Sequence, residues 1–188
     1  MGDRSGGHDG PMEKLLVLVN GLPGSGKTTL GQALAPTMDA RFLQKDAVKE
    51  ALAGCVAGAA DLPTLGGIAM DAIWSLVQAS STTAIIDSWW FRPRDLEFAR
   101  AGIGKARADR VVEVWCDVPA DIARARYTNR CRAALHRDEQ RVIRDWHIWA
   151  ERAEPLGLTP TVLVDTTRPV DCSDLARRVE RAAGRLDA

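Results

Sequence analysis

The most constraining feature of this chain is a glycine-rich segment that directly follows an apolar run. Residues 15–19 are all apolar, which indicates a strand buried on both faces. A helix pattern begins at Lys27, shortly after the run ends. The pattern G-x-x-x-x-G-K-[ST] is matched in full by Gly21, Leu22, Pro23, Gly24, Ser25, Gly26, Lys27 and Thr28, followed by Thr29. Strand, loop and helix in this order predict a phosphate-binding loop; a glycine-rich turn with a chance lysine is the alternative.

The composition of this loop suits a nucleoside triphosphate. Glycines let the backbone wrap closely around an anion with its N–H groups pointing inward, and the start of the helix adds the positive end of its dipole. Lys27 supplies a mobile positive charge for the β- and γ-phosphates, and the Thr28 hydroxyl is a suitable ligand for Mg²⁺. We therefore assign the nine loop residues to nucleotide binding and Thr28 also to the metal.

Four further apolar runs follow this first strand. They lie at residues 41–43, 83–86, 111–115 and 161–164, and helix-period stretches without tight hairpin signals separate them. Continuous apolar strands that alternate with helices predict a parallel sheet covered on both faces. With 188 residues, the chain is expected to form one domain over residues 13–188, preceded by a flexible tail at residues 1–12.

The charges of the chain balance, with 25 Lys and Arg residues against 25 Asp and Glu residues. A neutral chain argues against binding of duplex nucleic acid and against a polybasic membrane patch. No apolar run approaches the roughly 18 residues that cross a membrane, and the first residues lack the apolar segment of a signal peptide. The cysteines are too widely spaced for a metal knuckle or a redox pair, so we expect reduced thiols at Cys55, Cys116, Cys131 and Cys172. Together these features predict a cytoplasmic protein, and none of them indicates an oligomeric state.

An arginine-rich segment without glycine or proline occupies residues 120–154. This length exceeds one ordinary helix, so we expect two helices with a mobile connection at residues 128–137, the second starting near Asp138. Spacings of 4, 7, 4 and 3 residues would place five arginines on one stripe of an unbroken helix: Arg126, Arg130, Arg137, Arg141 and Arg144. A bound anion would relieve their repulsion, which is about a few tenths of a kcal/mol per pair. The alternative is a solvated face with acidic partners.

With these features the chain resembles the P-loop kinases of small molecules, in the branch that holds chloramphenicol phosphotransferase, gluconate kinase, zeta toxin and the polynucleotide 5′-kinases. The resemblance covers residues 14–183. It implies a three-layer α/β P-loop NTPase fold, with a five-stranded parallel sheet of order 2-3-1-4-5 and a helical lid at residues 126–140. It also implies ATP and Mg²⁺ as cofactors.

The same resemblance implies roles for residues beyond the loop. An Asp in the place of Asp46 binds the acceptor hydroxyl and takes its proton, although a helix N-cap is the local alternative. Asp87 resembles the acid that holds a Mg²⁺-bound water or touches the acceptor, with an Asx turn as the alternative. Arg126 and Arg130 resemble lid arginines that cover the transferring phosphate or stack on adenine. Thr166 lies in a loop similar to one beside adenine.

The acceptor site is expected to involve an aromatic loop. Trp89 and Trp90 follow the third strand and are poor choices for solvent, so they either wall the acceptor pocket or pack under the lid. Arg92 is suited to hold an anionic group of the acceptor. Lys49 stands where the polynucleotide kinases tend to have Arg. Because lysine cannot form a bidentate fork, this residue weakens the polynucleotide interpretation.

The leading hypothesis is an ATP-dependent kinase that moves the γ-phosphoryl group of ATP to a hydroxyl of a small molecule. Its predicted catalytic residues are Lys27, Asp46 and Arg130, and its metal ligands are Thr28 and, through water, Asp87. Its predicted acceptor residues are Asp46, Lys49, Asp87, Trp89, Trp90 and Arg92. The alternatives are a nucleoside or polynucleotide 5′-hydroxyl kinase, an ATP-dependent switch without kinase activity, and a toxin that phosphorylates a nucleotide sugar.

Overall fold

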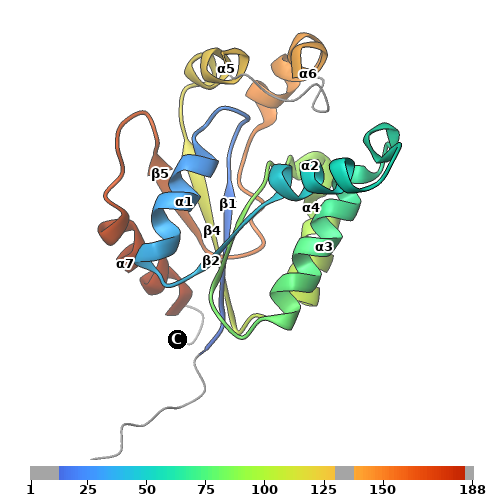
Figure 1. Ribbon diagram of the computed structural model, residues 1–188. Helices are drawn as coiled ribbons and strands as arrows, with labels where there is room; N and C mark the ends of the chain where they lie inside the picture. The colour runs from blue at the N-terminus through green and yellow to red at the C-terminus, as the bar shows by residue number, and fades with distance from the viewer. Residues whose placement is uncertain (1–12, 130–137, 185–188) are drawn as a thin grey trace, which may run out of the picture.

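A parallel sheet forms the centre of the structure, and helices cover both of its faces (Figure 1). The computed structural model describes residues 13–129 and 138–184, so the predicted tail at residues 1–12 lies outside it. The strands are β1 (Leu15–Asn20), β2 (Arg41–Gln44), β3 (Ala84–Asp87), β4 (Arg110–Asp117) and β5 (Thr161–Asp165). The helices are α1 (Lys27–Thr37), α2 (Lys45–Cys55), α3 (Leu65–Ala79), α4 (Arg92–Ala106), α5 (Ala120–Thr128), α6 (Asp138–Arg152) and α7 (Cys172–Ala183), with a short 3-10 helix η1 (Ala59–Asp61).

The strand order is β2-β3-β1-β4-β5 with all neighbours parallel, which confirms the predicted fold class and the predicted order 2-3-1-4-5. The register pairs Val19 of β1 with Asp87 of β3, and Asn20 of β1 with Trp115 of β4. The carboxyl ends of the three central strands therefore meet at one edge of the sheet. In open α/β sheets this edge is where ligands bind.

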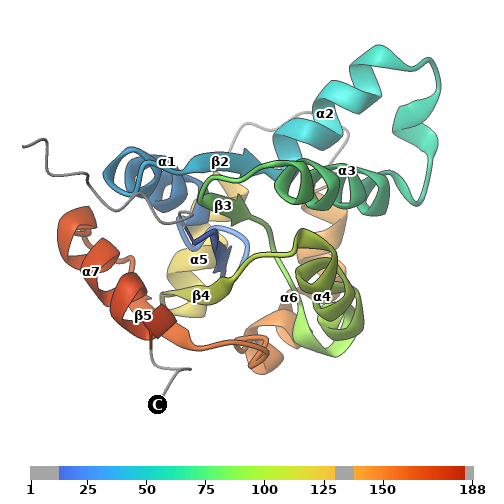
Figure 2. The same cartoon turned by 90° about the horizontal axis from the view of Figure 1, so that it is seen from below.

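Two apolar clusters fill the space between the sheet and its helices. Alternate residues of β1, such as Val17 and Leu18, point into opposite clusters, so the whole strand is buried. Figure 2 shows α1 and α7 on one side of the sheet and α3 and α4 on the other. Within the described parts of the chain, no helix is long and apolar enough to cross a membrane.

Helices α5 and α6 lie beyond the carboxyl end of the sheet, and we call them the lid helices (Figure 1). Helix α5 ends at Thr128, as expected for the first of the two predicted helices. The described part of α6 starts at Asp138, and because residues 130–137 lie outside the described residues, the predicted helix start near Asp138 stays a prediction. Aromatic rings join the two helices. Tyr127 of α5 stacks on Trp146 of α6 with a centroid distance of 6.3 Å, and Trp146 meets Trp149 edge-on at 6.2 Å.

The cysteines in the described part of the chain are free thiols, as the sequence predicted. Cys55 is exposed, Cys172 is half-buried and Cys116 is buried behind the phosphate loop. Burial raises the pKa of the Cys116 thiol to about 12, so this group stays protonated at neutral pH. Cys131 lies outside the described residues.

Candidate active site

The glycine-rich loop connects β1 to α1 and turns tightly beneath lid helix α5. Gly24 has a φ of 85°, and a Cβ added to it would lie 2.0 Å from the carbonyl oxygen of Ala123 in α5. Gly26 has a φ of 91° and precedes the first residue of α1. Side chains rarely adopt this left-handed backbone, so both positions require glycine. The result is a close-fitting loop whose backbone leads into a helix N-terminus, which is the arrangement that binds phosphate.

Lys27 folds back over the loop that precedes it. Its side-chain ammonium donates to the carbonyl oxygens of Gly21 at 2.7 Å and Leu22 at 2.8 Å, and the residue is 8% exposed. The Nζ atom also lies 5.9 Å from the ring centroid of Trp89, within the range of a cation–π contact. The loop, the ammonium and an aromatic ring from the segment after β3 therefore lie together.

Thr28 and Asp87 meet beside Lys27, although 59 residues separate them in the sequence. The Thr28 hydroxyl donates to Oδ2 of Asp87 at 2.5 Å, and the side-chain amide of Gln44 lies 3.5 Å from the same hydroxyl. Hydroxyl and carboxylate oxygens are the hard ligands that Mg²⁺ prefers. No group of three or more His, Cys, Asp or Glu side chains suited to a metal occurs among the described residues. The hydroxyl of Thr28 and the carboxylate of Asp87 are donors that would suit a Mg²⁺ ion at this place.

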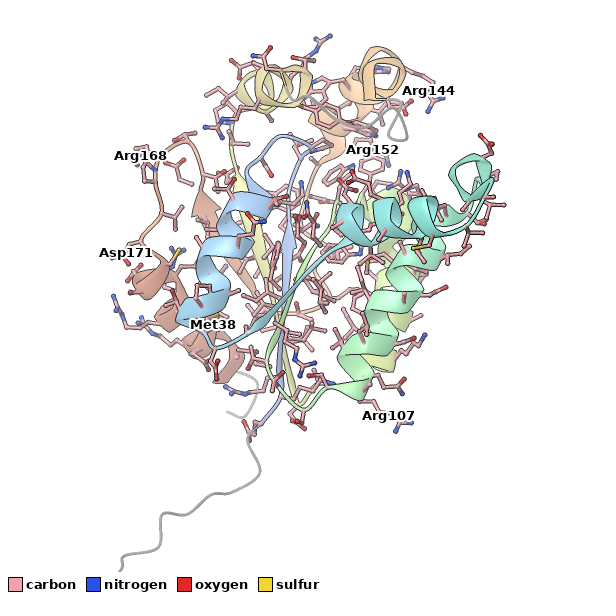
Figure 3. All side chains as sticks on the ribbon, viewed as in Figure 1. Met38, Arg107, Arg144, Arg152, Arg168 and Asp171 are labelled. Carbon is pink, nitrogen blue, oxygen red and sulfur yellow. The ribbon has the colours of Figure 1, made fainter. Side chains whose placement is uncertain are left out.

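A cavity of about 640 Å³ opens on the other side of the loop. Its lining comes from the phosphate loop, α1, α5 and the segment between β5 and α7, and includes Gly24, Gly26, Thr29, Leu30, Ala33, Arg126, Asn129, Thr166, Thr167, Arg168, Pro169, Val170 and Cys172. Figure 3 labels Arg168 and Asp171 on that last segment. The volume is typical of a small-molecule pocket.

Hydrogen bonds of Arg126 and Thr166 connect the segments that line this cavity. Arg126 Nη1 donates to the carbonyl oxygen of Thr166 at 3.0 Å. The Thr166 hydroxyl lies 2.7 Å from the carbonyl oxygen of Ser25 and 3.1 Å from that of Asp117. The structure thus brings two residues that the sequence assigned to the nucleotide against the phosphate loop itself.

Asp46 lies in the first turn of α2, two residues after β2 ends. Since Gln44 pairs in register with Asp87, the helix that carries Asp46 starts at the same edge of the sheet as the loop. Lys45 and Lys49 are on the same helix. Burial lowers the pKa of the Lys45 ammonium below its ordinary value, and Asp95 and Asp46 oppose this effect. The flank opposite the cavity is therefore charged.

The three aromatic residues after Ser88 point in different directions. Trp89 is half-buried, and its ring lies 5.8 Å from that of Phe91 and 6.4 Å from that of Trp149 in lid helix α6. Trp90 is 2% exposed and stacks on Trp74 in the core at 6.3 Å. The structure therefore brings Trp89 to the site but does not bring the ring of Trp90 there.

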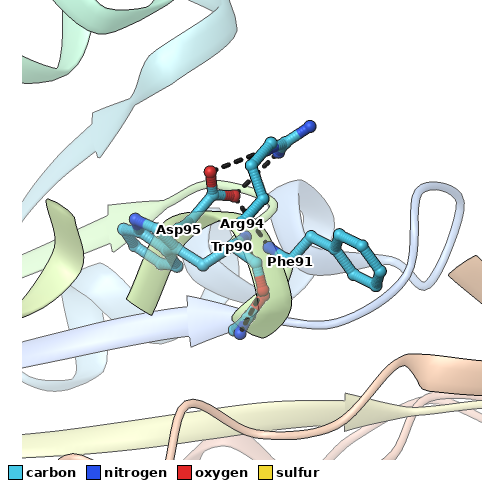
Figure 4. Close-up of polar contacts among 5 residues, drawn as sticks. Trp90, Phe91, Arg94 and Asp95 are labelled. Atoms are coloured by element: carbon cyan, nitrogen blue, oxygen red, sulfur yellow. Dashed lines mark hydrogen bonds and ion pairs between the residues drawn. The ribbon is translucent and has the colours of Figure 1, made fainter. Parts of the chain in front are cut away.

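Arg92 binds the segment that follows α6. Its Nη1 donates to Glu154 at 2.7 Å and its Nε donates to the carbonyl oxygen of Leu156 at 3.1 Å, so the guanidinium is engaged away from the phosphate loop. Arg94 donates from Nε and Nη2 to the two carboxyl oxygens of Asp95, both at 2.7 Å (Figure 4). This hydrogen bonding raises the pKa of Arg94. Neither arginine is brought to the loop.

The predicted stripe of arginines is divided between two helices. Arg126 belongs to α5, whereas Arg144 belongs to α6, is exposed and pairs with Asp145 at 2.6 Å (Figure 3). Arg130 and Arg137 lie outside the described residues, as does most of the predicted lid at residues 126–140. Their predicted roles stay predictions.

The structure also reveals two buried polar residues that sequence reasoning missed. Asn20, the last residue of β1, and Glu113, in the middle of β4, are both 0% exposed, and their side chains are hydrogen-bonded at 2.9 Å. The available signal was an acidic residue inside an otherwise apolar strand, at a position where charge is costly unless it is paired.

The sheet order, the loop geometry and the Thr28–Asp87 pair define a P-loop nucleotide-binding protein. A family model described as AAA domain matches residues 16–155, which is more than half of the chain. The chain belongs to this family.

Several solved structures resemble the chain over most of its length. A protein from Chloroflexus aurantiacus, described as a kinase, is 25% identical with a TM-score of 0.67, over 90% of this chain and 96% of that one. A gluconokinase from Sinorhizobium meliloti is 17% identical, with a TM-score of 0.56 over 90% and 91%. The tunicamycin resistance protein of Deinococcus radiodurans is 14% identical, with a TM-score of 0.57 over 91% and 96%. The last two share the fold, and the first supports phosphotransfer in general. No curated protein matches the chain significantly.

Proposed function

We propose that this protein transfers the γ-phosphoryl group of ATP to a hydroxyl of a small molecule. The observation that carries the proposal is the convergence of Lys27 and the Thr28–Asp87 pair at the loop, with the cavity on one side and Asp46 on the other. A phosphoryl transferase needs a phosphate site between a nucleotide site and an acceptor site, and this arrangement provides that order.

The nucleoside of ATP is proposed to occupy the cavity beside Arg126 and Thr166. The triphosphate would then follow the loop, where backbone N–H groups and the helix N-terminus bind its oxygens. The Lys27 ammonium is held over the loop by the carbonyl oxygens of Gly21 and Leu22. This positive charge is proposed to bind an oxygen of the β- or γ-phosphate. Arg130 stays the predicted lid contact to phosphate.

Thr28 and Asp87 are the residues that would hold Mg²⁺, Asp87 through a water molecule. When bound, Mg²⁺ neutralises part of the charge on the β- and γ-phosphates. Asp87 also accepts a hydrogen bond from the Thr28 hydroxyl, which turns the oxygen lone pairs of Thr28 away from the carboxylate. The two side chains thus form a preorganised pair at the start of α1 and the end of β3.

Asp46 is the proposed base of the transfer step. The acceptor oxygen forms a bond to the γ-phosphorus while the bond from phosphorus to the oxygen of the leaving ADP breaks, and the hydroxyl proton moves to the Asp46 carboxylate. Lys49 lies near this site, on the same helix, and is proposed to contact the acceptor. Trp89 borders Lys27 and contributes an apolar wall.

We propose that residues 13–188 form one kinase domain. In it, the lid helices cover the carboxyl edge of the sheet, where the phosphate loop lies. Their aromatic rings reach the segment after β3 through Trp149 and Trp89. Exclusion of water from the transferring group favours the acceptor over hydrolysis.

A nucleoside 5′-hydroxyl kinase is the second candidate, and Trp89 is the observation that favours it. An aromatic ring 5.9 Å from the phosphate-binding lysine suits an acceptor with a flat ring. A nucleoside has a flat base that can stack on Trp89, whereas a sugar or a hydroxy acid has no such surface. An assay with both kinds of acceptor therefore distinguishes the two candidates.

The test is transfer of label from [γ-³²P]ATP, with Mg²⁺, to a panel of sugars, hydroxy acids, aminoglycoside and phenicol antibiotics, nucleosides and short oligonucleotides. We expect one class to take label faster than water. A nucleoside preference would select the second candidate. Slow hydrolysis with every acceptor would contradict kinase activity and favour an ATP-dependent switch. The Lys27→Ala variant measures the background, and Lys105→Ala, at an exposed lysine near the far end of the sheet, is its matched control.

A further inference from the structure

Glu113 is an acidic residue at the centre of an apolar face of the sheet. It is 0% exposed, pairs in register with Leu18 of β1 and lies on the face that α3 and α4 cover. Burial raises the pKa of this carboxyl above its ordinary value, while hydrogen bonds from Asn20, Leu156 and Gly157 oppose the shift. Burial of an acid is costly in free energy unless its oxygens are hydrogen-bonded.

Hydrogen-bond donors face both oxygens of the Glu113 carboxyl group. The Asn20 side-chain amide donates to Oε1 at 2.9 Å. The backbone N–H of Leu156 lies 3.0 Å from Oε1 and 2.9 Å from Oε2. Because both oxygens act as acceptors, the Asn20 amide must present its nitrogen to Glu113 and its oxygen to the opposite side.

The orientation of Asn20 then determines what its oxygen can bind. Oδ1 accepts from the backbone N–H of Gly21 at 2.8 Å and from that of Trp90 at 3.1 Å. The Nδ2 atom also donates to the carbonyl oxygen of Trp90 at 3.2 Å. One side chain therefore fixes the first residue of the phosphate loop and the segment that carries Trp89.

Leu156 belongs to the chain that returns from lid helix α6 to β5. Besides its contact with Glu113, its carbonyl oxygen accepts from Arg92, which also pairs with Glu154. Arg92 starts α4, directly after the Trp90 segment. Three segments of the proposed site thus meet at one buried pair: the start of the phosphate loop, the β3–α4 loop and the return from the lid.

We propose that Asn20 and Glu113 are positioning residues that hold these three segments in the geometry needed for nucleotide binding and phosphoryl transfer. The proposal rests on the proposed function, since it assigns these residues to the same site. Both act through the backbone groups of Gly21, Trp90 and Leu156. Neither is a catalytic residue, because neither side chain reaches the phosphate site itself.

The test exchanges the amide and the acid between the two positions. Glu113→Gln keeps the volume but places an NH₂ group against a donor, and Asn20→Asp places two carboxyl groups against each other. The double variant Asn20→Asp/Glu113→Gln restores a donor and acceptor pair and keeps the acceptor for Gly21 and Trp90. We expect each single variant to raise the KM for Mg·ATP by about tenfold in an ATP turnover assay, and the double variant to recover most of that loss.

Amide hydrogen exchange on the full chain provides a readout that is independent of any acceptor. We expect faster exchange at Gly21, Trp90 and Leu156 in the single variants, unchanged exchange in α7, and recovery in the double variant. Glu97→Gln, at an exposed glutamate of α4, is the matched control and should change neither readout. Wild-type behaviour of both single variants would overturn the proposal. A double variant no better than the singles, or a uniform rise in exchange, would also overturn it by indicating general destabilisation.

The two proposals fail in different ways. The wild-type protein could label no acceptor while amide exchange at Gly21, Trp90 and Leu156 still rises in the single variants and recovers in the double variant. In that case the positioning pair stands and the kinase proposal fails. If label transfer succeeds while the single variants keep their KM and exchange rates, the kinase proposal stands and the positioning pair fails.

Discussion

Helices α1 and α2 each contain 11 residues and each start at the same edge of the sheet, but they differ in burial. Five residues of α1 are buried, including Lys27, because this helix packs on the sheet. Every residue of α2 is described and none is buried; this helix packs mainly against α3. The comparison teaches that the core of the fold holds the nucleotide side of the site, whereas a peripheral helix carries the proposed acceptor side.

The contacts of the two sides differ in the same way. On the nucleotide side, Lys27, Arg126 and Thr166 bind backbone carbonyl groups, whose positions the fold determines. On the acceptor side, the pKa of Lys45 is lowered by burial and raised by the neighbouring side chains of Asp95 and Asp46. Side chains of a peripheral helix can change without loss of the core, so acceptor specificity can vary while nucleotide binding is kept.

The largest effect is expected on the nucleotide side, from Lys27→Ala. Removal of the ammonium leaves the charge on the transferring phosphoryl group uncompensated, so we expect a loss of about 10²–10³ in kcat together with weaker ATP binding. Initial rates of label transfer measure the first quantity. The Lys105→Ala control should keep the wild-type rate, and an equal rate in Lys27→Ala would contradict the assignment.

On the acceptor side, Asp46→Asn is expected to separate transfer from binding. The amide cannot take the acceptor proton, so transfer to the best acceptor of the panel should fall by about 10²-fold while the ATP affinity stays unchanged. Steady-state kinetics with both substrates varied provide the measurement. Asp61→Asn, at an exposed acid in η1, is the control. Wild-type turnover by Asp46→Asn would remove Asp46 from the mechanism.

The contrast between the confined phosphate loop and the peripheral helix α2 predicts opposite effects on stability when a glycine in each is replaced by alanine. Gly24→Ala would place a Cβ 2.0 Å from a carbonyl oxygen, and we expect it to lower the free energy of unfolding by about 1–3 kcal/mol and to impair ATP binding. Gly54→Ala lies inside α2 with no atom within 4 Å of the new Cβ, and we expect a gain of about 0.4–1 kcal/mol. Urea denaturation measures both, and a tolerated Gly24→Ala would show that the loop is not confined by α5.

The smallest expected effect is a pH dependence of stability that comes from Glu113. Burial raises its pKa, so the folded protein keeps the proton at pH values where the unfolded chain has lost it. Stability from this residue is therefore present at low pH and is lost as the pH rises from the ordinary pKa through the raised one. The wild type should therefore lose stability relative to Glu113→Gln across that window. Urea denaturation of both proteins at a series of pH values tests the sign. A wild-type free energy of unfolding that rises relative to that of Glu113→Gln as the pH increases would contradict the prediction.

Sequence patterns predicted the framework of this molecule because its strands are apolar on both faces. The five apolar runs coincide with strands β1 to β5, and the loop motif located Lys27 and Thr28. The pairing of Thr28 with Asp87 follows from the parallel sheet, which brings the carboxyl ends of β1 and β3 together. The nucleotide side is predictable because local motif and sheet topology agree there.

The acceptor side could not be predicted to the same degree. Consecutive aromatic residues carry no sequence signal for which ring faces the core, and Trp90 rather than Trp89 packs on Trp74. Arg92 binds the return from α6, a contact between residues 64 positions apart that no local pattern encodes. The Asn20–Glu113 pair depends on strand register, which places the two side chains on one face only after the sheet has formed.

Calorimetric titration of ATP in the presence of Mg²⁺ tests the central claim most directly, because it needs no knowledge of the acceptor. We expect the wild type and Asp46→Asn to bind one ATP with similar affinity and Lys27→Ala to bind it much more weakly. Absence of binding to the wild type, or equal affinity in Lys27→Ala, would contradict the account.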